Sequence, residues 1–188
     1  MLQNFQVGQF WVGHNVDSRA YYALLYEARG LGIPIVHRRS GESFAWGKVT
    51  GRFLWPPNDA EVAVASNDDS VVLSLRDGST RFLLPGDIQK DVEQKLIQDG
   101  DPLGSAFLKV PHHGSKTSSS QSFLAAVHPE YAVISVGAHN TFGLPSPEVM
   151  DRYRHDGIAL WRTDRDGAVT AFCWDNRVTI MPFVRADR

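Results

Sequence analysis

The chain has 188 residues, of which 43% are hydrophobic and 21% are charged. This length and composition indicate a single folded domain, residues 1–188, with its own core, and they exclude a disordered chain. The formal net charge of −2 argues against a dedicated nucleic-acid-binding module, because such modules are usually basic. Any contact with nucleic acid must therefore be local, or depend on other parts of the protein.

The first predicted elements are a helix and two short strands. Asp17-Ser18 is a candidate cap for a helix that Gly30 closes. β-Type runs follow at 33–36 and 49–55. The predicted apolar face of the helix consists of Tyr21, Leu24, Leu25 and Ala28.

A hairpin is the clearest local prediction of the central part. Two β-rich runs, 71–75 and 81–84, flank Asp77-Gly78, a pair typical of a type I′ turn. A helical stripe follows, formed by Ile88, Val92, Leu96 and Ile97.

Strands and helices alternate in the remaining sequence. Buried strands are predicted at 106–110 and 131–137, with a helix around 123–127 between them. Ser146-Pro147-Glu148 has the capping serine, first-position proline and acidic first turn of a helix start. Strands at 159–162, 168–174 and 178–183 end the chain. Hairpins followed by strand–helix–strand units predict an α/β (α+β) fold, with sheets covered by helices.

Polar clusters follow three of these predicted strands. The clusters are Gly86-Asp87, His112-His113 with a hydroxyl-rich loop, and His139-Asn140. Ligands of layered α/β proteins gather at the carboxyl ends of strands, so these clusters predict one convergent site. Carboxylate and imidazole suit zinc, manganese or iron, and two such ions can convert a bound water into a nucleophile.

We therefore predict Asp87 as a ligand that bridges two ions and His113 as a terminal ligand, with His112 as a further candidate. His112, Ser115, Lys116 and the serines at 118–120 are expected either to hold phosphate oxygens or to orient the ligands. Simpler explanations remain open. Asp87 could instead cap a helix, the His-His pair could be structural, and the serines at 118–120 could be capping and solvated.

Two further sets of polar residues each have two alternative roles. Asn67, Asp68 and Asp69 precede the predicted hairpin, so they form either a turn or a set of side chains that reach the metals. His139 and Asn140 are equally consistent with a site and with a loop.

Taken together, these residues resemble the C-terminal domain of ComEC-type DNA-internalisation competence proteins. The resemblance rests on LLPGD at 83–87, FLKVPHHGSKTS at 107–118 and AVISVG at 132–137 with Asn140 and Gly143. Asn67 to Leu73 and the closing segment 162–169 also match. The resemblance runs from about Leu2 to Trp174, and the string KVPHHGSKTS is its most specific part.

The resemblance implies an αββα metallo-β-lactamase fold with two divalent ions, zinc or manganese, and hydrolysis of nucleic-acid phosphodiesters. It assigns Asp87 as the bridging ligand and His113 as a ligand of the second ion, without settling His112 against His113. Thr117, Asn67, Asp68 and Asn140, with Ser115 and Lys116, are expected near the substrate or behind the ligands. Single- or double-stranded DNA is the expected partner, and whole members carry membrane-spanning segments.

Two departures from the family pattern matter. The main metal motif of the fold, His-x-His-x-Asp-His, is not found in this sequence, and Gly143-Leu144-Pro145 stands where members usually have Gly-His-Pro. We therefore expect only the C-terminal half of the fold, with weak or absent metal binding and impaired activity. The alternative is a non-catalytic binding or assembly module, or a decayed remnant, complementing an N-terminal half or membrane channel portion.

The expected localisation depends on whether the chain is complete as given or is part of a longer protein. The apolar runs are too short to cross a bilayer, and the N-terminus has neither a basic start nor an apolar run. A chain complete as given is therefore expected in the cytoplasm, whereas part of a full-length competence protein is expected at the membrane.

Overall fold

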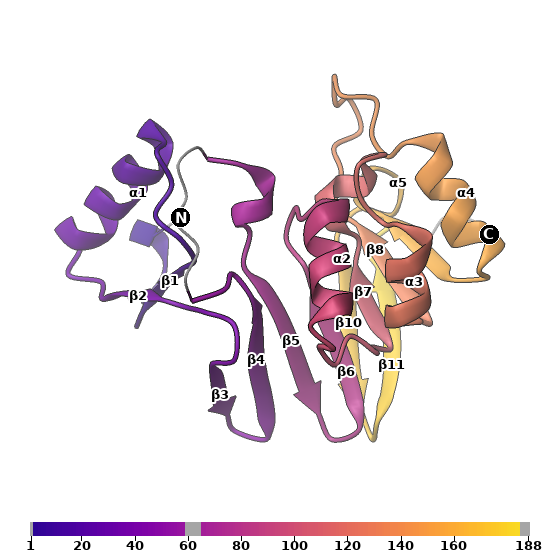
Figure 1. Ribbon diagram of the computed structural model, residues 1–188, viewed down its shortest axis with the longest axis horizontal. Coiled ribbons are helices and arrows are strands. Elements are labelled where there is room, and N and C mark those ends of the chain that lie inside the picture. Colours follow the sequence, from indigo (N-terminus) through magenta and orange to yellow (C-terminus); the bar gives the residue numbers. More distant parts are fainter. Residues whose placement is uncertain (1, 59–64, 185–188) are drawn as a thin grey trace.

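The computed structural model describes residues 2–58 and 65–184, and a seven-stranded mixed sheet organises them (Figure 1). Its strand order is β3-β4-β5-β6-β7-β8-β9. The first four strands are antiparallel and the pairs β6–β7, β7–β8 and β8–β9 are parallel. The strands are β3 (Ser43–Trp46), β4 (Val49–Trp55), β5 (Val72–Asp77), β6 (Thr80–Leu84), β7 (Phe107–Lys109), β8 (Tyr131–Ile134) and β9 (Ala159–Arg162).

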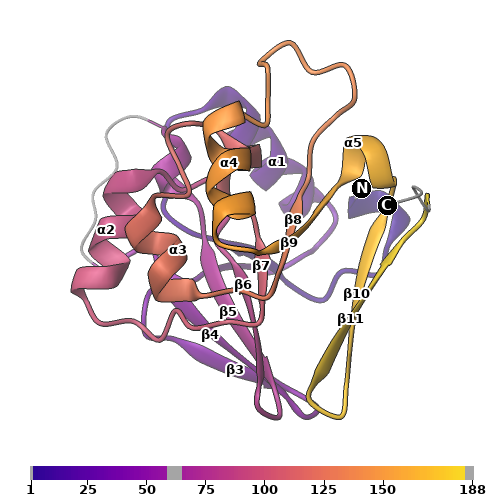
Figure 2. The same ribbon diagram turned by 90° about the vertical axis from the view of Figure 1, so that its right-hand side faces the viewer.

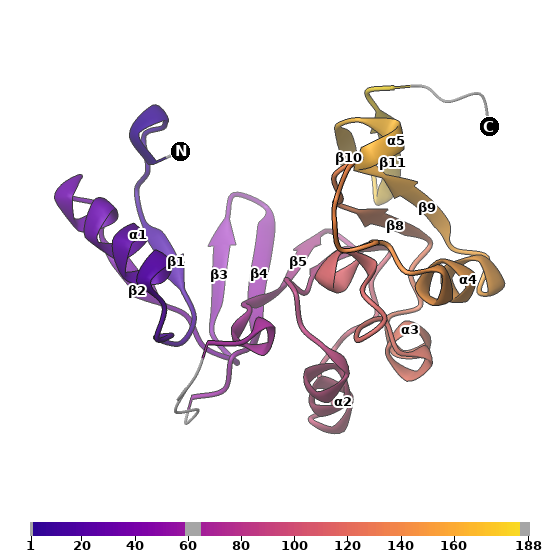
Figure 3. The ribbon, with the colours of Figure 1, turned by 90° about the horizontal axis from the view of Figure 1, so that it is seen from above.

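Three helices cover one face of this sheet, and a hairpin lies on the other side (Figures 2 and 3). The helices are α2 (Lys90–Gln98), α3 (Gln121–Val127) and α4 (Pro147–His155). The hairpin consists of β10 (Val169–Trp174) and β11 (Arg177–Pro182), preceded by the short helix α5 (Thr163–Asp166). This large mixed sheet with helices confirms the predicted α/β class. No helix of the described residues is long and apolar enough to span a membrane.

The core lies between the sheet and these three helices. Alternate residues of the strands point toward the helices, and on the central strands β5 to β8 residues of this face are buried. The predicted stripe of α2 is confirmed, although its first member precedes the helix. The buried residues include Val72, Leu83, Leu108 and Ile134 from strands, and Ile88, Val92, Leu96, Phe123, Leu124, Val149 and Tyr153 from the helical side.

The N-terminal part forms a smaller unit beside β3 and β4 (Figures 1 and 3). It contains α1 (Arg19–Gly30) and a parallel pair of strands, β1 (Phe10–Val12) and β2 (Ile35–His37). An aromatic cluster joins it to the sheet, with the Trp11 ring 4.8 Å from that of Phe44 and 5.5 Å from that of Phe53. The predicted apolar face of α1 is only half correct, because Leu25 and Ala28 are buried while Leu24 is exposed.

The predicted hairpin is confirmed, but the predicted position of its turn is wrong by one residue, and so is the predicted turn type. Asp77 pairs with Thr80, so the two loop residues are Gly78 and Ser79. Only Gly78 has a positive φ, +61°, which is the type II′ pattern. The helix start at Ser146 is also confirmed, since its hydroxyl accepts a hydrogen bond from the Val149 amide.

Candidate metal centre

The centre forms where the parallel strands β6 and β7 end side by side. Asp87 follows β6, and His112 and His113 follow β7 in a short turn, Pro111–Gly114. The two segments are in direct contact, because the His112 amide donates to the Gly86 carbonyl at 3.3 Å. Asp87 does not cap a helix, since α2 begins at Lys90 with Gln89 as its capping position. The capping explanation of Asp87 is therefore wrong.

Asp87 and His113 face each other. The His113 Nε2 lies 3.4 Å from the Asp87 Oδ2, and both side chains are partly exposed. The other ring nitrogen, Nδ1, lies 2.6 Å from the backbone carbonyl oxygen of Ser135, at the end of β8. A carbonyl can only accept, so Nδ1 carries a proton, and Nε2 is the ring nitrogen turned toward the Asp87 carboxylate. This is the orientation in which histidines ligate metals.

His112 is held differently, because both of its ring nitrogens have partners. Its Nε2 lies 3.1 Å from the Asn67 amide nitrogen, and its Nδ1 lies 3.3 Å from the Thr117 hydroxyl. The Asn67 NH₂ group can only donate, so Nε2 accepts and no lone pair is left for a metal. The geometry therefore favours His113 over His112 as a ligand.

Both histidines have left-handed backbone conformations. The φ angles are 47° at His112 and 53° at His113, a region that costs a non-glycine residue about 1–3 kcal/mol. Gly114 also has a positive φ, and a Cβ there would lie only 2.6 Å from the Cβ of Pro145. The turn is thus tightly fixed, and its conformation directs the two rings in different directions.

Asp87 is positioned by two residues that the sequence analysis did not single out. Its backbone amide donates to the Ser70 hydroxyl at 2.9 Å, and the Lys109 ammonium lies 3.3 Å from its Oδ1. Lys109 also donates to the Gly86 carbonyl at 3.1 Å. A lysine in a buried strand, three residues before two histidines, was the available signal for this role. Its charge balances the Asp87 carboxylate.

The Asn67–Asp69 segment is a single 3-10 turn with a reciprocal cap from Ser66. Asp69 completes that cap, which confirms the turn explanation for this residue. Asp68 accepts a hydrogen bond from the Gln89 amide at 2.7 Å and so ties the turn to the start of α2. Asn67 alone reaches a predicted site residue, His112.

The hydroxyl-rich loop supports His112 and borders a cavity. The Thr117 hydroxyl lies 3.0 Å from that of Ser115 as well as contacting His112. Lys116 is exposed, and with Asp68 and Thr117 it lines a cavity of about 400 Å³. Lys116 is therefore the member of this loop with a charge available to a ligand in that cavity.

The serines at 118–120 fulfil only part of their prediction. Ser120 caps α3, as expected. The prediction that these serines are solvated is wrong for Ser118 and Ser119, because both are fully buried. Glu93 of α2 accepts backbone hydrogen bonds from Ser119 and Ser120, and burial raises the pKa of its carboxyl group. Ser119 and Ser120 therefore attach the loop to Glu93 of α2.

Asn140 holds the loop that follows β8. Its amide nitrogen donates to the carbonyls of Gly137 and Leu144, and its Oδ1 accepts from the Leu144 amide. Together with His113, Asn140 lines a separate cavity of about 320 Å³, which the exposed Phe142 also borders. Asn140 thus shapes the side of the cavity next to His113, while His139 is exposed.

The donor set fits part of a metal site. Asp87 and His113 offer an oxygen and a nitrogen ligand with suitable orientation, but no cluster of three or more His, Cys, Asp or Glu suited to a metal occurs among the described residues. A closed zinc site needs four ligands, and a catalytic zinc site usually takes three from the protein. The pair is therefore a partial ligand set.

Comparison with known proteins agrees with this fold. Residues 7–139 match the family model of the metallo-beta-lactamase superfamily. The chain belongs to that superfamily. Among solved structures it is similar to a point mutant of the CmlA beta-hydroxylase, with a TM-score of 0.50 and 13% identity over 83% of this chain and 38% of that one. At this identity the likeness concerns the fold alone.

Within the superfamily, three similar curated proteins are competence proteins of the ComEC type. The chain is 40% identical over 129 residues to competence protein ComA of Neisseria gonorrhoeae, covering 68% of this chain and 18% of that protein. It is 30% identical over 155 residues to ComE operon protein 3 of Bacillus subtilis, covering 82% and 20%. Recombination protein 2 of Haemophilus influenzae is 34% identical over 142 residues, covering 75% and 17%. The chain thus spans about a fifth of the length of these relatives, and the predicted resemblance is confirmed.

Proposed function

We propose that this chain supplies part of a metal-dependent phosphodiester hydrolase centre that acts on DNA during its uptake. The observation that carries this proposal is the Asp87–His113 pair, with Nε2 turned to the carboxylate and Nδ1 fixed by the Ser135 carbonyl. Membership of the superfamily and the competence relatives support the substrate class. If the chain is part of a membrane protein like these relatives, such a centre would contact DNA as the DNA is taken up.

The residues of the chain would divide the work as follows. Asp87 and His113 would hold a divalent ion, zinc or manganese, and such ions would activate water and stabilise charge on phosphate oxygens. Lys109 and Ser70 position Asp87. Lys116 would attract the phosphate backbone at the mouth of the neighbouring cavity.

The partial ligand set limits what the chain does alone. Two protein ligands give weak metal affinity, so we propose that full activity requires ligands from another polypeptide segment. Isothermal titration with Zn²⁺ or Mn²⁺, followed by cleavage of a phosphodiester substrate, tests this. We expect weak binding that Asp87→Ala abolishes, and little turnover. Robust turnover by the chain alone, lost in Asp87→Ala, would show that the centre is complete and the partial-site account wrong.

A second candidate function is a non-catalytic assembly module, and one surface favours it. Phe172, Trp174 and Met181 share the outward face of the β10–β11 hairpin and are 51%, 77% and 51% exposed. Contiguous exposed apolar side chains of this kind mark protein-interaction surfaces. Light scattering and binding of a hydrophobic dye test this function. A monomer that binds no dye would argue against it.

A further inference from the structure

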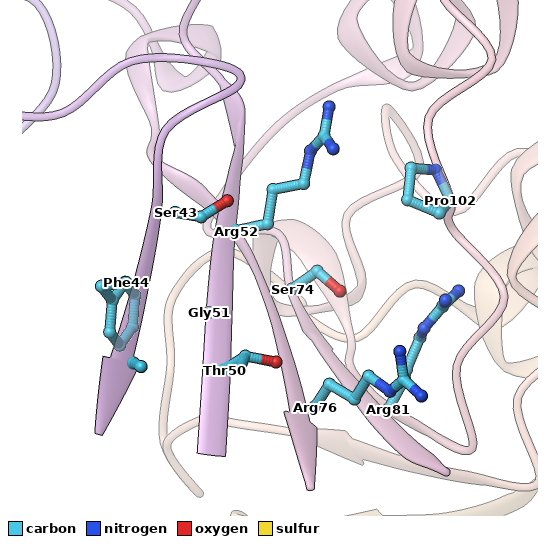
Figure 4. A pocket seen from close by; sticks show the side chains of 10 residues that line it. Ser43, Phe44, Thr50, Gly51, Arg52, Ser74, Arg76, Arg81 and Pro102 are labelled. Atoms are coloured by element: carbon cyan, nitrogen blue, oxygen red, sulfur yellow. The ribbon is translucent and has the colours of Figure 1, made fainter. Parts of the chain in front are cut away.

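A second cluster of polar side chains lies near the far end of β6 from Asp87. Arg52 of β4, Arg76 of β5 and Arg81 of β6 come from three neighbouring strands and extend toward the same side of the sheet (Figure 4). They line a cavity of about 560 Å³ together with Ser43, Thr50, Ser74 and Pro102. None of these residues belongs to the candidate metal centre.

The strand register shows why the arginines converge. Arg76 lies directly opposite Arg81, and Arg52 lies opposite Ser74, two residues before Arg76 on β5. Side chains at opposite and alternate positions share one face of a sheet, so the three arginines share the helix-bearing face. The helix α2 covers the part of this face nearer Asp87, where Val72 and Leu83 are buried, and the arginines occupy the part near the turns.

The arrangement has excess positive charge. Like charges directly opposite each other on neighbouring strands are destabilising, and Arg76 and Arg81 are such a pair. Among the salt bridges found in residues 2–58 and 65–184, none involves Arg52, Arg76 or Arg81. The acidic groups nearby are few. Asp101 lies close enough to Arg52 for its charge to be felt, and Asp77 pairs with Lys48 instead.

We infer that this cavity, the arginine pocket, binds the phosphodiester backbone of a single DNA strand. Guanidinium groups bind phosphate oxygens in pairs of hydrogen bonds, and the hydroxyls of Ser74 and Thr50 can add further donors. A volume of about 560 Å³ lies within the range of known ligand pockets. Because the net charge of the chain is −2, a local cluster of this kind is the form that nucleic-acid contact must take.

The pocket deepens the proposed function and rests on it. Arg81 is the second of the five residues of β6 and Asp87 lies three residues beyond its end, so the two residues are at most about 20 Å apart along the chain. A strand held at the arginine pocket would thus be kept near the metal centre by a contact that takes no part in hydrolysis. Binding and chemistry can therefore be lost separately.

Fluorescence anisotropy with a labelled oligothymidylate tests the inference. The double variant Arg76→Gln/Arg81→Gln is compared with Arg19→Gln/Arg29→Gln, which removes the same charge from exposed positions of α1. We expect about a tenfold loss of affinity in the first variant only. In the same variant, the slope of the logarithm of the binding constant against the logarithm of the salt concentration should be shallower by roughly 1.4, which is about 0.7 for each lost contact. Since Arg76 also donates to the Gly78 carbonyl in the turn, Arg52→Gln serves as a second variant that leaves this turn intact.

Three results would overturn the inference. One is equal affinity of the wild type, Arg52→Gln and the double variant. Another is an equal loss in the control variant, which would indicate a general charge effect. The last is complete displacement of the oligonucleotide by inorganic phosphate that binds as tightly as the oligonucleotide does. This result would make the pocket a site for the free ion. Metal titration of the wild type and of Asp87→Ala, beside the DNA titration of the arginine variants, separates the two proposals. A loss of DNA affinity with metal binding insensitive to Asp87→Ala would contradict only the proposed function.

Discussion

Glu93 connects α2 to the loop beneath the candidate metal centre. Its side chain is fully buried, and its two carboxylate oxygens accept backbone hydrogen bonds from Ser119 at 2.5 Å and Ser120 at 2.9 Å. Glutamine has nearly the same shape but replaces one of these oxygens by an NH₂ group. That group would face a backbone N–H, and both are donors. Glu93→Gln therefore leaves one buried donor without an acceptor.

The expected cost follows from this single lost acceptor. A buried, unsatisfied donor costs about 1–3 kcal/mol, so Glu93→Gln should lower the free energy of unfolding by about that amount. Urea denaturation followed by circular dichroism measures it. Glu130→Gln, at an exposed position, is the matched control and should change stability by less than about 0.5 kcal/mol. If Glu93→Gln were as stable as this control, the anchoring role of Glu93 would be wrong.

The pH dependence of the same variant has a definite sign. Burial raises the pKa of Glu93 above the ordinary value of 4.5, despite the opposing effects of its hydrogen bonds and of Lys90. The stability that this group contributes is thus fully present below its unfolded pKa and is lost as pH rises through the folded pKa. Glutamine does not titrate. The stability advantage of the wild type over Glu93→Gln should therefore be larger at about pH 4 than at about pH 8.

Two further substitutions test other parts of the account. The Arg162 guanidinium donates two hydrogen bonds to Asp164, at 3.0 and 2.6 Å, and lowers the pKa of its carboxyl group. Asp164→Asn should therefore destabilise the chain at neutral pH, and the difference from the wild type should vanish as pH falls through the lowered pKa; a constant difference in urea denaturation would contradict this. Gly114→Ala combines a positive φ with a Cβ 2.6 Å from that of Pro145, so it should cost about 1–3 kcal/mol, and unchanged stability would refute the tight packing of the histidine turn.

Local sequence chemistry was enough to predict several elements. The capping serine and proline at 146–147 gave the start of α4, and the β-rich runs gave β4 and β9 with their observed bounds. β3 was not predicted, because Ser43–Trp46 has no alternation strong enough to distinguish it from a loop. Its pairing with β4 creates the strand, and the Phe44 ring packs over Gly51.

The composition of the site was predictable from the sequence, but its contacts were not. Asp87 and the two histidines were found because they follow strands, which is a local signal. His112 and His113 are neighbours in the same turn, so only the direction of each ring distinguishes them. Ser135 contributes a backbone carbonyl, which has no signature in a sequence.

The arginine pocket depends on a register that the sequence analysis placed incorrectly. With Asp77-Gly78 as the turn, Arg76 would pair with Ser79 instead of Arg81. The observed turn at Gly78 and Ser79 brings the two arginines directly opposite each other. A shift of one residue in the turn therefore decides whether Arg76 and Arg81 are predicted to lie directly opposite each other.

Metal titration of the two histidine variants tests the central claim most directly. Zn²⁺ or Mn²⁺ is titrated into the wild type, His113→Gln and His112→Gln, with heat as the readout. The account predicts at least a tenfold loss of affinity in His113→Gln, because a ligand is removed, and a loss of less than about threefold in His112→Gln, whose nitrogens bond to Asn67 and Thr117. A larger loss in His112→Gln, or no binding by the wild type, would contradict the assignment of Asp87 and His113 as the metal ligands.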